Sequence, residues 1–258
     1  MAYAQVFLNI ALRGAQANKD IAMKPRIGIG MNYRTTDTDS ERAYLDNKYF
    51  DVLAELGAMP LPVIPTEDVI LLDALLKQVD GILFTGGLDI DPGLWDEELH
   101  EETRLLHPRR QRFDLLLYEQ AQKLRLPVMG ICLGIQMINV AHGGSLHQYL
   151  PDVNDEIDHG DEEHTTTHTV TLEVKSQIHK WLQIEQITVP SCHQQGINRL
   201  GKGLDAAGKT EDGLVEVIER PKYPFLFAMQ WHLERDMDQP ISRTLFDKFL
   251  AAAANRNP

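Results

Sequence analysis

The chain has 258 residues and a net charge of −13, which argues against nucleic acid or an anionic membrane surface as a partner. Hydrophobic residues make up 43% and charged residues 24%, as in ordinary globular proteins, and no apolar run reaches the roughly 18 residues of a membrane span. Two cysteines, Cys132 and Cys192, cannot build a disulfide framework, so we expect a reducing, cytoplasmic location.

The first 24 residues differ from the rest of the chain. They carry no charge before Arg13 and no basic segment of the kind that opens a secretory signal. They fit an additional helix, a disordered extension, or sequence upstream of a natural start at Met23. We therefore predict an N-terminal extension over residues 1–24 and a single domain over residues 25–258.

Strands and helices alternate through the first half of the chain. Apolar runs predict strands over residues 26–33, 59–65, 80–85 and 126–130. Helical spacing predicts a first helix with Ser40 as its cap and Gly57 as its end. Further helices are expected after a cap at Thr66 and over residues 110–124 and 133–141. This alternation predicts an α/β fold, with an open, mostly parallel sheet covered by helices on both faces.

The second half is richer in short strands. Residues 152–164 abound in Asp, Glu and His and are typical of a solvated loop, whereas residues 168–174 alternate like a strand with one wet face. Apolar segments joined by Gly, Pro and Asn turns predict strands over residues 187–193, 203–210, 213–220 and 224–232. A helix over residues 246–254 is expected near the end.

Cys132 lies between the strand that ends at Gly130 and the helix predicted from Leu133. Gly130 and Gly134 flank it, as in a nucleophile elbow, where a tight turn lifts a reactive side chain to the carboxyl edge of the sheet. The unpaired N–H groups and the dipole of a helix N-terminus favour thiolate over thiol. The alternative is a buried structural cysteine, which is common in protein cores.

A thiol nucleophile needs a base, and the base needs a group that orients it. The apolar run 225–231 delivers His232 at or just past the end of a predicted strand. If the extended backbone continues, Glu234 points to the same face and can accept a hydrogen bond from the imidazole. The alternative is that the two residues form a surface pair at a strand end.

Acyl transfer also requires hydrogen-bond donors for the developing oxyanion. The Leu133 N–H directly follows the cysteine, and Thr85-Gly86-Gly87 ends the third predicted strand. Two glycines there let the backbone turn tightly and approach a ligand closely. The glycine pair alone is weak evidence, but three such motifs at the ends of three predicted strands indicate one shared site.

From about Arg26 to Phe249 the chain resembles the class I glutamine amidotransferase-like hydrolases, and most closely the gamma-glutamyl-gamma-aminobutyrate hydrolase group. The matching segments, in family order and spacing, are FTGGLDIDP, residues 110–114, PVMGICLGIQMINVAHGGSLHQYL, PSCHQQGINRLGKGL, EDGLVEVIE and MQWHLE. The chain departs from the family pattern at Gln111, Leu133 and Leu233, where the family usually has Asp, Arg and Pro.

The resemblance implies a flavodoxin-like fold with extra β-strands in its second half, and a catalytic domain over residues 25–258. It implies that Cys132 is the nucleophile, His232 the base and Glu234 the residue that orients the base. The N–H groups of Gly87 and Leu133 would form the oxyanion hole. Substrate contacts are expected from five further residues, namely Gly86, Gln136, Ser191, Cys192 and His193.

Three histidines, His159, His164 and His168, invite interpretation as metal ligands. The segment between the last two favours a strand over a helix, no cysteine accompanies it, and the acidic surroundings suit a solvated loop. We therefore expect no metal and no cofactor. Cys192 beside His193 imitates a second Cys-His pair, but adjacent strand residues face opposite sides, so direct activation is not expected.

The activity implied by the resemblance is thioester-mediated hydrolysis of a γ-glutamyl amide, such as gamma-glutamyl-gamma-aminobutyrate or a related small amine of polyamine catabolism. One alternative is a glutaminase subunit that delivers ammonia to a separate synthase, which 258 residues cannot also house. Another is an inactive binding relative, against which the joint presence of Cys132, His232 and Glu234 argues. The expected partner is a small molecule, and a homodimer is compatible with the sequence.

Overall fold

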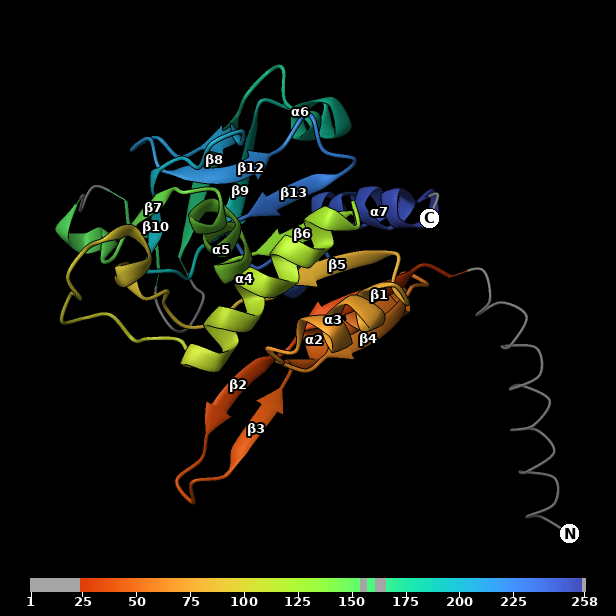
Figure 1. The fold of residues 1–258 in the computed structure, drawn as a ribbon. Helices are drawn as coiled ribbons and strands as arrows, with labels where there is room; N and C mark the ends of the chain where they lie inside the picture. The colour runs from red at the N-terminus through yellow and green to blue at the C-terminus, as the bar shows by residue number, and fades with distance from the viewer. Residues whose placement is uncertain (1–23, 154–156, 161–165, 257–258) are drawn as a thin grey trace, which may run out of the picture.

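A computed structural model describes residues 24–153, 157–160 and 166–256 (Figure 1). Its centre is an 11-stranded sheet with the main strand order β4-β1-β5-β6-β13-β12-β11-β8-β9, to which β10 and β7 add at β12. A separate two-stranded hairpin, β2–β3, projects from the body. The extension predicted over residues 1–24 lies almost wholly outside the described residues, so it and the domain boundaries stay predictions.

The elements are short and closely spaced. The strands are β1 Arg26–Gly30, β2 Asn32–Thr35, β3 Glu41–Tyr44, β4 Met59–Val63, β5 Gly81–Phe84, β6 Val128–Ile131, β7 Ser145–His147, β8 Thr167–Leu172, β9 Gln186–Pro190, β10 Gly196–Arg199, β11 Asp205–Lys209, β12 Val215–Glu219 and β13 Leu226–Met229. The α-helices are α2 Asn47–Glu55, α3 Val69–Leu76, α4 Pro108–Lys123, α5 Leu133–Ala141, α6 Gln177–Leu182 and α7 Pro240–Ala254. Short 3₁₀ segments are η1 Pro92–Trp95, η2 Leu150–Asp152 and η3 Leu233–Arg235.

One half of the sheet is parallel and covered by helices on both faces. Parallel pairs join β4 to β1, β1 to β5, β5 to β6 and β6 to β13. Buried side chains of α3, α4 and α5 pack in one core cluster, and those of α2, α6 and α7 pack in a second. This arrangement confirms the predicted α/β fold.

The other half of the sheet is antiparallel and comes from the second half of the chain. β13 pairs with β12, β12 with β11, β11 with β8 and β8 with β9. The extra strands expected after residue 150 are therefore present. β13, the last strand in sequence, lies between β6 and β12 and joins the two halves. Within the described residues no helix combines the length and apolar character needed to cross a membrane.

Two predicted helix caps are wrong. Ser40 lies in the turn of the β2–β3 hairpin, whose strands pair Asn32 with Tyr44, and α2 begins only after Asp46, whose side chain accepts the Lys48 N–H. Asp68, not Thr66, caps α3, because its carboxylate accepts the N–H groups of two residues in the first turn. The Thr66 hydroxyl instead accepts the Asp68 N–H.

Three predicted boundaries also move. The first strand, expected over residues 26–33, is interrupted at Met31 and continues as the hairpin. The strand expected over residues 187–193 ends at Pro190, so Ser191 to His193 are not in a strand. The last helix begins at Pro240 rather than at residue 246, and proline suits a first helical position because its missing N–H would have no helical partner there.

Candidate active site

Cys132 occupies the turn between β6 and α5, at the carboxyl end of the parallel strands. Its φ of 53° and ψ of −108° lie in a region that non-glycine residues rarely adopt, which is the strained geometry of a nucleophile elbow. A Cβ on Gly134 would come 2.9 Å from the Phe84 carbonyl oxygen, and one on Gly130 would come 3.0 Å from Ala228 Cβ. The flanking glycines are thus required for helix, strand and turn to approach this closely.

His232 lies three residues after the end of β13, and Glu234 two residues further on. His232 Nδ1 lies 2.7 Å from Glu234 Oε1, and the Glu234 side chain is fully buried. The backbone there is the 3₁₀ segment η3 rather than the extended chain that the sequence suggested, so the predicted contact is present but its predicted geometry is wrong. Leu233, which stands where the family usually has Pro, is buried in this turn.

The charges of Cys132, His232 and Glu234 depend on one another. Burial alone would lower the pKa of His232, but the Cys132 sulfur, through its charge and a hydrogen bond, and the Glu234 carboxylate raise it to about 10. His232 is therefore held as an imidazolium beside the sulfur. Gln230, which the sequence patterns did not single out, places its amide nitrogen 3.8 Å from Cys132 Sγ.

The glycine turn after β5 lies beside the elbow. A Cβ on Gly87 would come 2.7 Å from Leu133 Cδ2, and one on Gly86 would come 2.8 Å from His232 Cε1. The Leu133 N–H, at the first position of α5, has no acceptor within the helix because such groups never do. The structure therefore brings the two predicted oxyanion-hole residues together next to Cys132, and their role stays a prediction.

A buried chain of hydrogen bonds holds this glycine turn. Arg110 from α4 donates to Asp114 at 2.7 Å, to the Thr85 hydroxyl at 3.1 Å and to the Asn32 side chain at 2.7 Å. Asn32 in turn donates to the Gly86 carbonyl at 3.2 Å. The sequence matches the segment containing Arg110 to a family motif without indicating its role, because its partners lie on distant elements.

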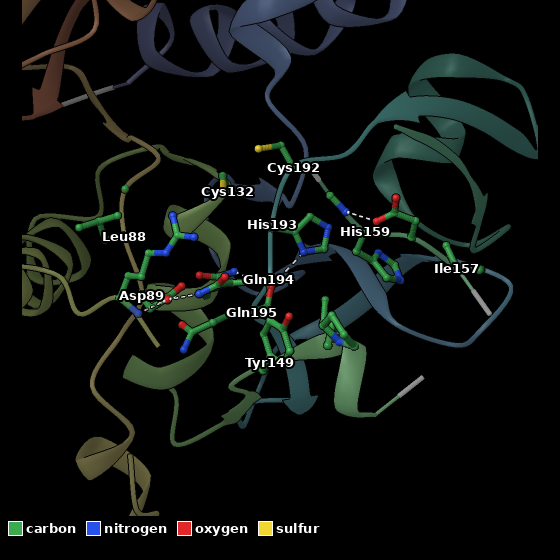
Figure 2. A pocket seen from close by; sticks show the side chains of 17 residues that line it. Leu88, Asp89, Cys132, Tyr149, Ile157, His159, Cys192, His193, Gln194 and Gln195 are labelled. Atoms are coloured by element: carbon green, nitrogen blue, oxygen red, sulfur yellow. Dashed lines mark hydrogen bonds between the residues drawn. The ribbon is translucent and has the colours of Figure 1, made fainter. Parts of the chain in front are cut away.

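A cavity of about 650 Å³ opens next to the elbow (Figure 2). Among the predicted site residues, those that line it are Gly87, Cys132, Gln136, Cys192 and His193. Charged residues of both signs also line it, including Asp89, Arg104 and Asp158. The reactive sulfur thus faces a space large enough for a small substrate.

Two predicted substrate contacts have other partners. Gln136 lines the cavity, but its amide nitrogen donates to the Gln195 carbonyl at 2.9 Å and to Gln230 at 3.2 Å. Ser191 is buried, and its hydroxyl donates to the His159 carbonyl. Both residues therefore help to hold the wall of the cavity, and their predicted contact with substrate stays a prediction.

The described residues of the predicted solvated loop, 152–153 and 157–160, are mostly exposed as expected, but His159 among them is buried. His159 and His168 are buried, and so is Glu216 of β12, which the sequence patterns did not single out. Burial would raise the pKa of Glu216, but the neighbouring His193 and His168 lower it to about 2. The carboxylate is therefore charged although it has no exposed surface. His164 lies outside the described residues.

The fold and site define an α/β protein with a cysteine at a strand-to-helix elbow and a His-Glu pair on the neighbouring strand end. The chain belongs to the Peptidase C26 family, whose model matches residues 25–234. This family is glutamine amidotransferase-like and hydrolytic, as the sequence resemblance implied.

The curated relatives include both amidotransferase-like proteins and hydrolases by name. The glutamine amidotransferase-like protein YvdE of Lactococcus lactis is 35% identical over 81% of this chain and 90% of its own length. The gamma-glutamyl-gamma-aminobutyrate hydrolase PuuD of Escherichia coli K12 is 28% identical over 91% of this chain and 95% of its own length.

Solved structures share the fold at low sequence identity. A GMP synthase subunit from Thermoplasma acidophilum superposes with a TM-score of 0.63 and 20% identity, covering 90% of this chain and 94% of its own. The glutaminase domain of CTPS from Trypanosoma brucei gives a TM-score of 0.57 and 18% identity, covering 91% of this chain and 96% of its own.

Proposed function

We propose that this protein hydrolyses γ-glutamyl amides of small amines, with gamma-glutamyl-gamma-aminobutyrate as the model substrate. The observation that supports the proposal is a pair of contacts, from Cys132 to His232 and from His232 to Glu234. They lie at the edge of the cavity and beside the glycine turn. The names of relatives such as PuuD support the substrate class.

In the proposed reaction the Cys132 thiolate attacks the side-chain carbonyl carbon, and the negative charge moves to the oxygen, near the N–H groups of Gly87 and Leu133. The His232 imidazolium gives its proton to the leaving nitrogen as the C–N bond breaks, which releases the amine and leaves a glutamyl thioester. Water then attacks the thioester and gives a proton to His232. Glutamate leaves as the C–S bond breaks, and the thiolate–imidazolium pair is restored.

The cavity supports an amino acid head on the substrate. Such a head carries an ammonium and a carboxylate, and the charged residues of both signs in the cavity wall can accommodate this pair. A cavity of about 650 Å³ has room for the glutamyl part together with a small amine beyond the scissile bond.

The test is to compare kcat/KM for gamma-glutamyl-gamma-aminobutyrate, glutamine and an α-glutamyl peptide, with free amine and ammonia measured separately. Cys132→Ala protein is the control for contaminating hydrolases. We expect the γ-glutamyl amine to be cleaved fastest and the α-peptide not at all, because α-linkage puts the scissile carbonyl where the charged head binds.

The competing function is a glutaminase subunit that supplies ammonia to a synthase, which the amidotransferase-like names of other relatives favour. Glutamine as the best substrate would establish that function instead. Cleavage of the α-peptide as the best substrate would contradict both.

A further inference from the structure

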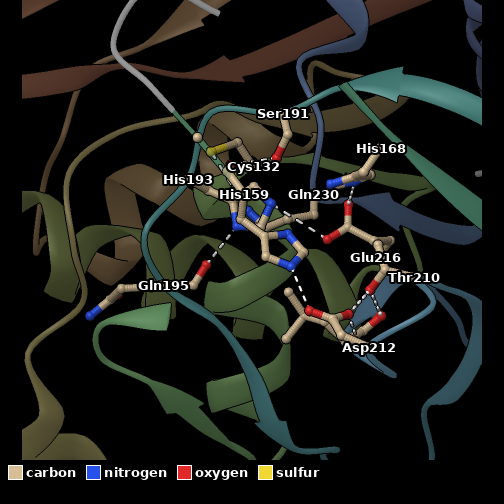
Figure 3. Close-up of polar contacts among 12 residues, drawn as sticks. Cys132, His159, His168, Ser191, His193, Gln195, Thr210, Asp212, Glu216 and Gln230 are labelled. Carbon is tan, nitrogen blue, oxygen red and sulfur yellow. Dashed lines mark hydrogen bonds and ion pairs between the residues drawn. The ribbon is translucent and has the colours of Figure 1, made fainter. Parts of the chain in front are cut away.

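A cluster of three histidines and one glutamate lies partly in and partly behind the cavity wall, and none of the four transfers a proton or forms a bond in the proposed reaction (Figure 3). His168 comes from β8, Glu216 from β12, His193 from the segment after β9 and His159 from residues 157–160. Each side chain is at most 3% exposed. Four titratable groups buried together need a charge-balanced arrangement, because water cannot stabilise them.

The partners of His159 fix which of its nitrogens carries hydrogen. Nε2 lies 2.8 Å from Asp212 Oδ2, and a carboxylate accepts, so Nε2 is the donor. The lone pair of neutral His159 is then on Nδ1, which is buried and has no hydrogen-bond partner among the described residues. Asp212 is itself held by the Thr210 hydroxyl and by the Leu214 N–H.

The same reasoning applies to His193. Its Nδ1 lies 3.0 Å from the Gln195 carbonyl oxygen, so Nδ1 carries a hydrogen and, in the neutral ring, Nε2 carries the lone pair. That lone pair lies 3.4 Å from Glu216 Oε1, without hydrogen-bond geometry. Both ring nitrogens of His168 are likewise buried without a hydrogen-bond partner in the described chain, and Nε2 lies 3.3 Å from Glu216 Oε2. The Glu216 charge is therefore balanced either by protons on these imidazoles or by a metal ion, and the lack of hydrogen-bond geometry at these nitrogens favours the metal ion.

We propose that the cluster binds a divalent transition-metal ion, with Zn²⁺ as the best match, through His159, His168 and Glu216. The candidate ligand atoms of these residues lie within 4.8 Å of one another. Bonds of about 2.0–2.1 Å to tetrahedral zinc place ligand atoms roughly 3.3 Å apart, which is the separation between His168 Nε2 and Glu216 Oε2. Side-chain rotations that bring two ligand atoms closer by at most about 1.5 Å give even the most widely separated pair the spacing of tetrahedral zinc ligands.

The surrounding contacts also match a metal site. Asp212 behind His159 is the carboxylate partner that ligating histidines commonly have, since it fixes the tautomer and orients the ring. His193 Nε2 lies 3.4 Å from the other oxygen of Glu216 and outside the group of three candidate ligands. Two imidazoles and one carboxylate, with a water in the fourth position, form a ligand set that zinc accepts in proteins.

The metal ion would connect the antiparallel strands to the wall of the cavity. His159 and His193 both line the cavity, and the Ser191 hydroxyl donates to the His159 carbonyl. The ion would thus fix the cavity wall without touching the reacting sulfur. The inference is independent of the proposed hydrolysis, since Cys132 is not a ligand.

The test is a titration of metal-free, full-length protein with Zn²⁺ by calorimetry and with Co²⁺ by visible absorption. Cys132→Ala protein is titrated in parallel, so that the reactive thiolate does not contribute. We expect one equivalent of either ion to bind, with a tetrahedral Co²⁺ spectrum, in both proteins. Asp212→Asn should weaken binding about 10–100-fold, and Glu216→Gln and His159→Gln should weaken it at least as much.

The matched control is His100→Gln, because His100 also pairs with a carboxylate, Asp152 at 3.0 Å, but lies outside the cluster. It should bind Zn²⁺ like the unchanged protein. Equal affinities in Glu216→Gln and the unchanged protein, or no stoichiometric binding by the unchanged protein, would overturn the proposal.

A second measurement needs no variant, in case the substituted proteins do not fold. Long-range ¹H–¹⁵N spectra of the histidine rings report the state of each nitrogen directly. We expect one equivalent of Zn²⁺ to shift the ring nitrogens of His159 and His168 and to leave those of His100 unchanged. Imidazolium signals from the cluster that Zn²⁺ does not alter would show that protons alone balance the Glu216 charge, and would overturn the proposal.

Discussion

Cys132 combines a strained backbone with a charged neighbour, and each has a separate consequence. The positive φ turns the side chain toward the cavity that it lines, and the His232 imidazolium stabilises negative charge on sulfur. Because the pKa of His232 is raised from 6.5 to about 10, the imidazolium persists through that interval and is lost as the pH rises through about 10. The reactivity that Cys132 owes to this imidazolium should therefore be lost as His232 loses its proton.

We predict that iodoacetamide alkylates Cys132 faster than Cys192, as measured by peptide mass spectrometry. Near pH 6.5 Cys132 should be alkylated up to about 100-fold faster in the unchanged protein than in His232→Ala, because an ordinary thiol is only about 1% ionised at that pH. This difference in alkylation rate between the two proteins should shrink as the pH approaches about 10, where the His232 imidazolium loses its proton. Equal labelling of the two cysteines, or an advantage that grows with pH, would contradict this account.

Substitution within the reactive group should show unequal roles. Cys132→Ala should abolish turnover, and His232→Ala should lower kcat by about 10⁴–10⁶-fold, because these residues act as a unit. Glu234→Gln should cost less, about 10⁴-fold or below, since an amide can still accept the hydrogen bond from His232 Nδ1.

Steady-state kinetics of the three variants, with circular dichroism as the folding control, test this order. The assignment of Glu234 as an orienting residue fails if Glu234→Gln is the most damaging of the three. It also fails if Cys132→Ala retains turnover.

At the scale of elements, β5 and α5 meet at a separation that only glycine allows. Gly134→Ala would place a Cβ 2.9 Å from the Phe84 carbonyl oxygen, and this backbone atom cannot rotate away. We predict a loss of about 1–3 kcal/mol in the free energy of unfolding, measured with urea, because α5 must move away from β5.

Gly93→Ala is the matched control, since Gly93 is exposed and the nearest atom to its added Cβ is the Asp91 carboxylate oxygen at 3.1 Å, on a flexible side chain. Its free energy of unfolding should change by less than about 0.5 kcal/mol. Equal losses in the two variants would show that close packing at the elbow is not the cause.

The elements that could be predicted from the sequence are those with an unambiguous apolar pattern. α5 spans the predicted residues 133–141, and the parallel strands lie within the predicted runs or extend them by one residue. The β2–β3 hairpin could not be predicted, because its residues are mostly polar and exposed and give no apolar alternation. The predicted caps were wrong because Ser40 and Thr66 are good capping types, and only backbone geometry selects Asp46 and Asp68 instead.

The site was predictable to the extent that its residues follow strand ends. Cys132, His232 and the glycine turn meet because β6, β13 and β5 are neighbours in the sheet. The cluster around Glu216 was not predictable, since its members come from separate segments and their burial depends on strand order. The buried role of Arg110 depends in the same way on partners distant in sequence.

At the scale of the whole molecule, every described element that carries the site begins at Arg26 or later. The Arg26 N–H, at the start of β1, donates to Asp80 at 2.8 Å. We predict that a chain starting at Met23 folds and reacts like the full chain. Calorimetric melting temperature and kcat/KM of the two proteins test this, and a drop of several degrees on truncation would show that the first residues contribute to stability.

The position of β13 also affects how the protein is made. This strand is synthesised last among the strands that the structure describes, yet it fills the gap between β6 and β12 in the middle of the sheet. A nascent chain that stops before Leu226 leaves two apolar strand edges unpaired, which favours aggregation and proteolysis. The same missing segment carries His232 and Glu234. The segment that completes the sheet between β6 and β12 is therefore also the segment that supplies the base. An incomplete translation product that lacks it never has an activated Cys132.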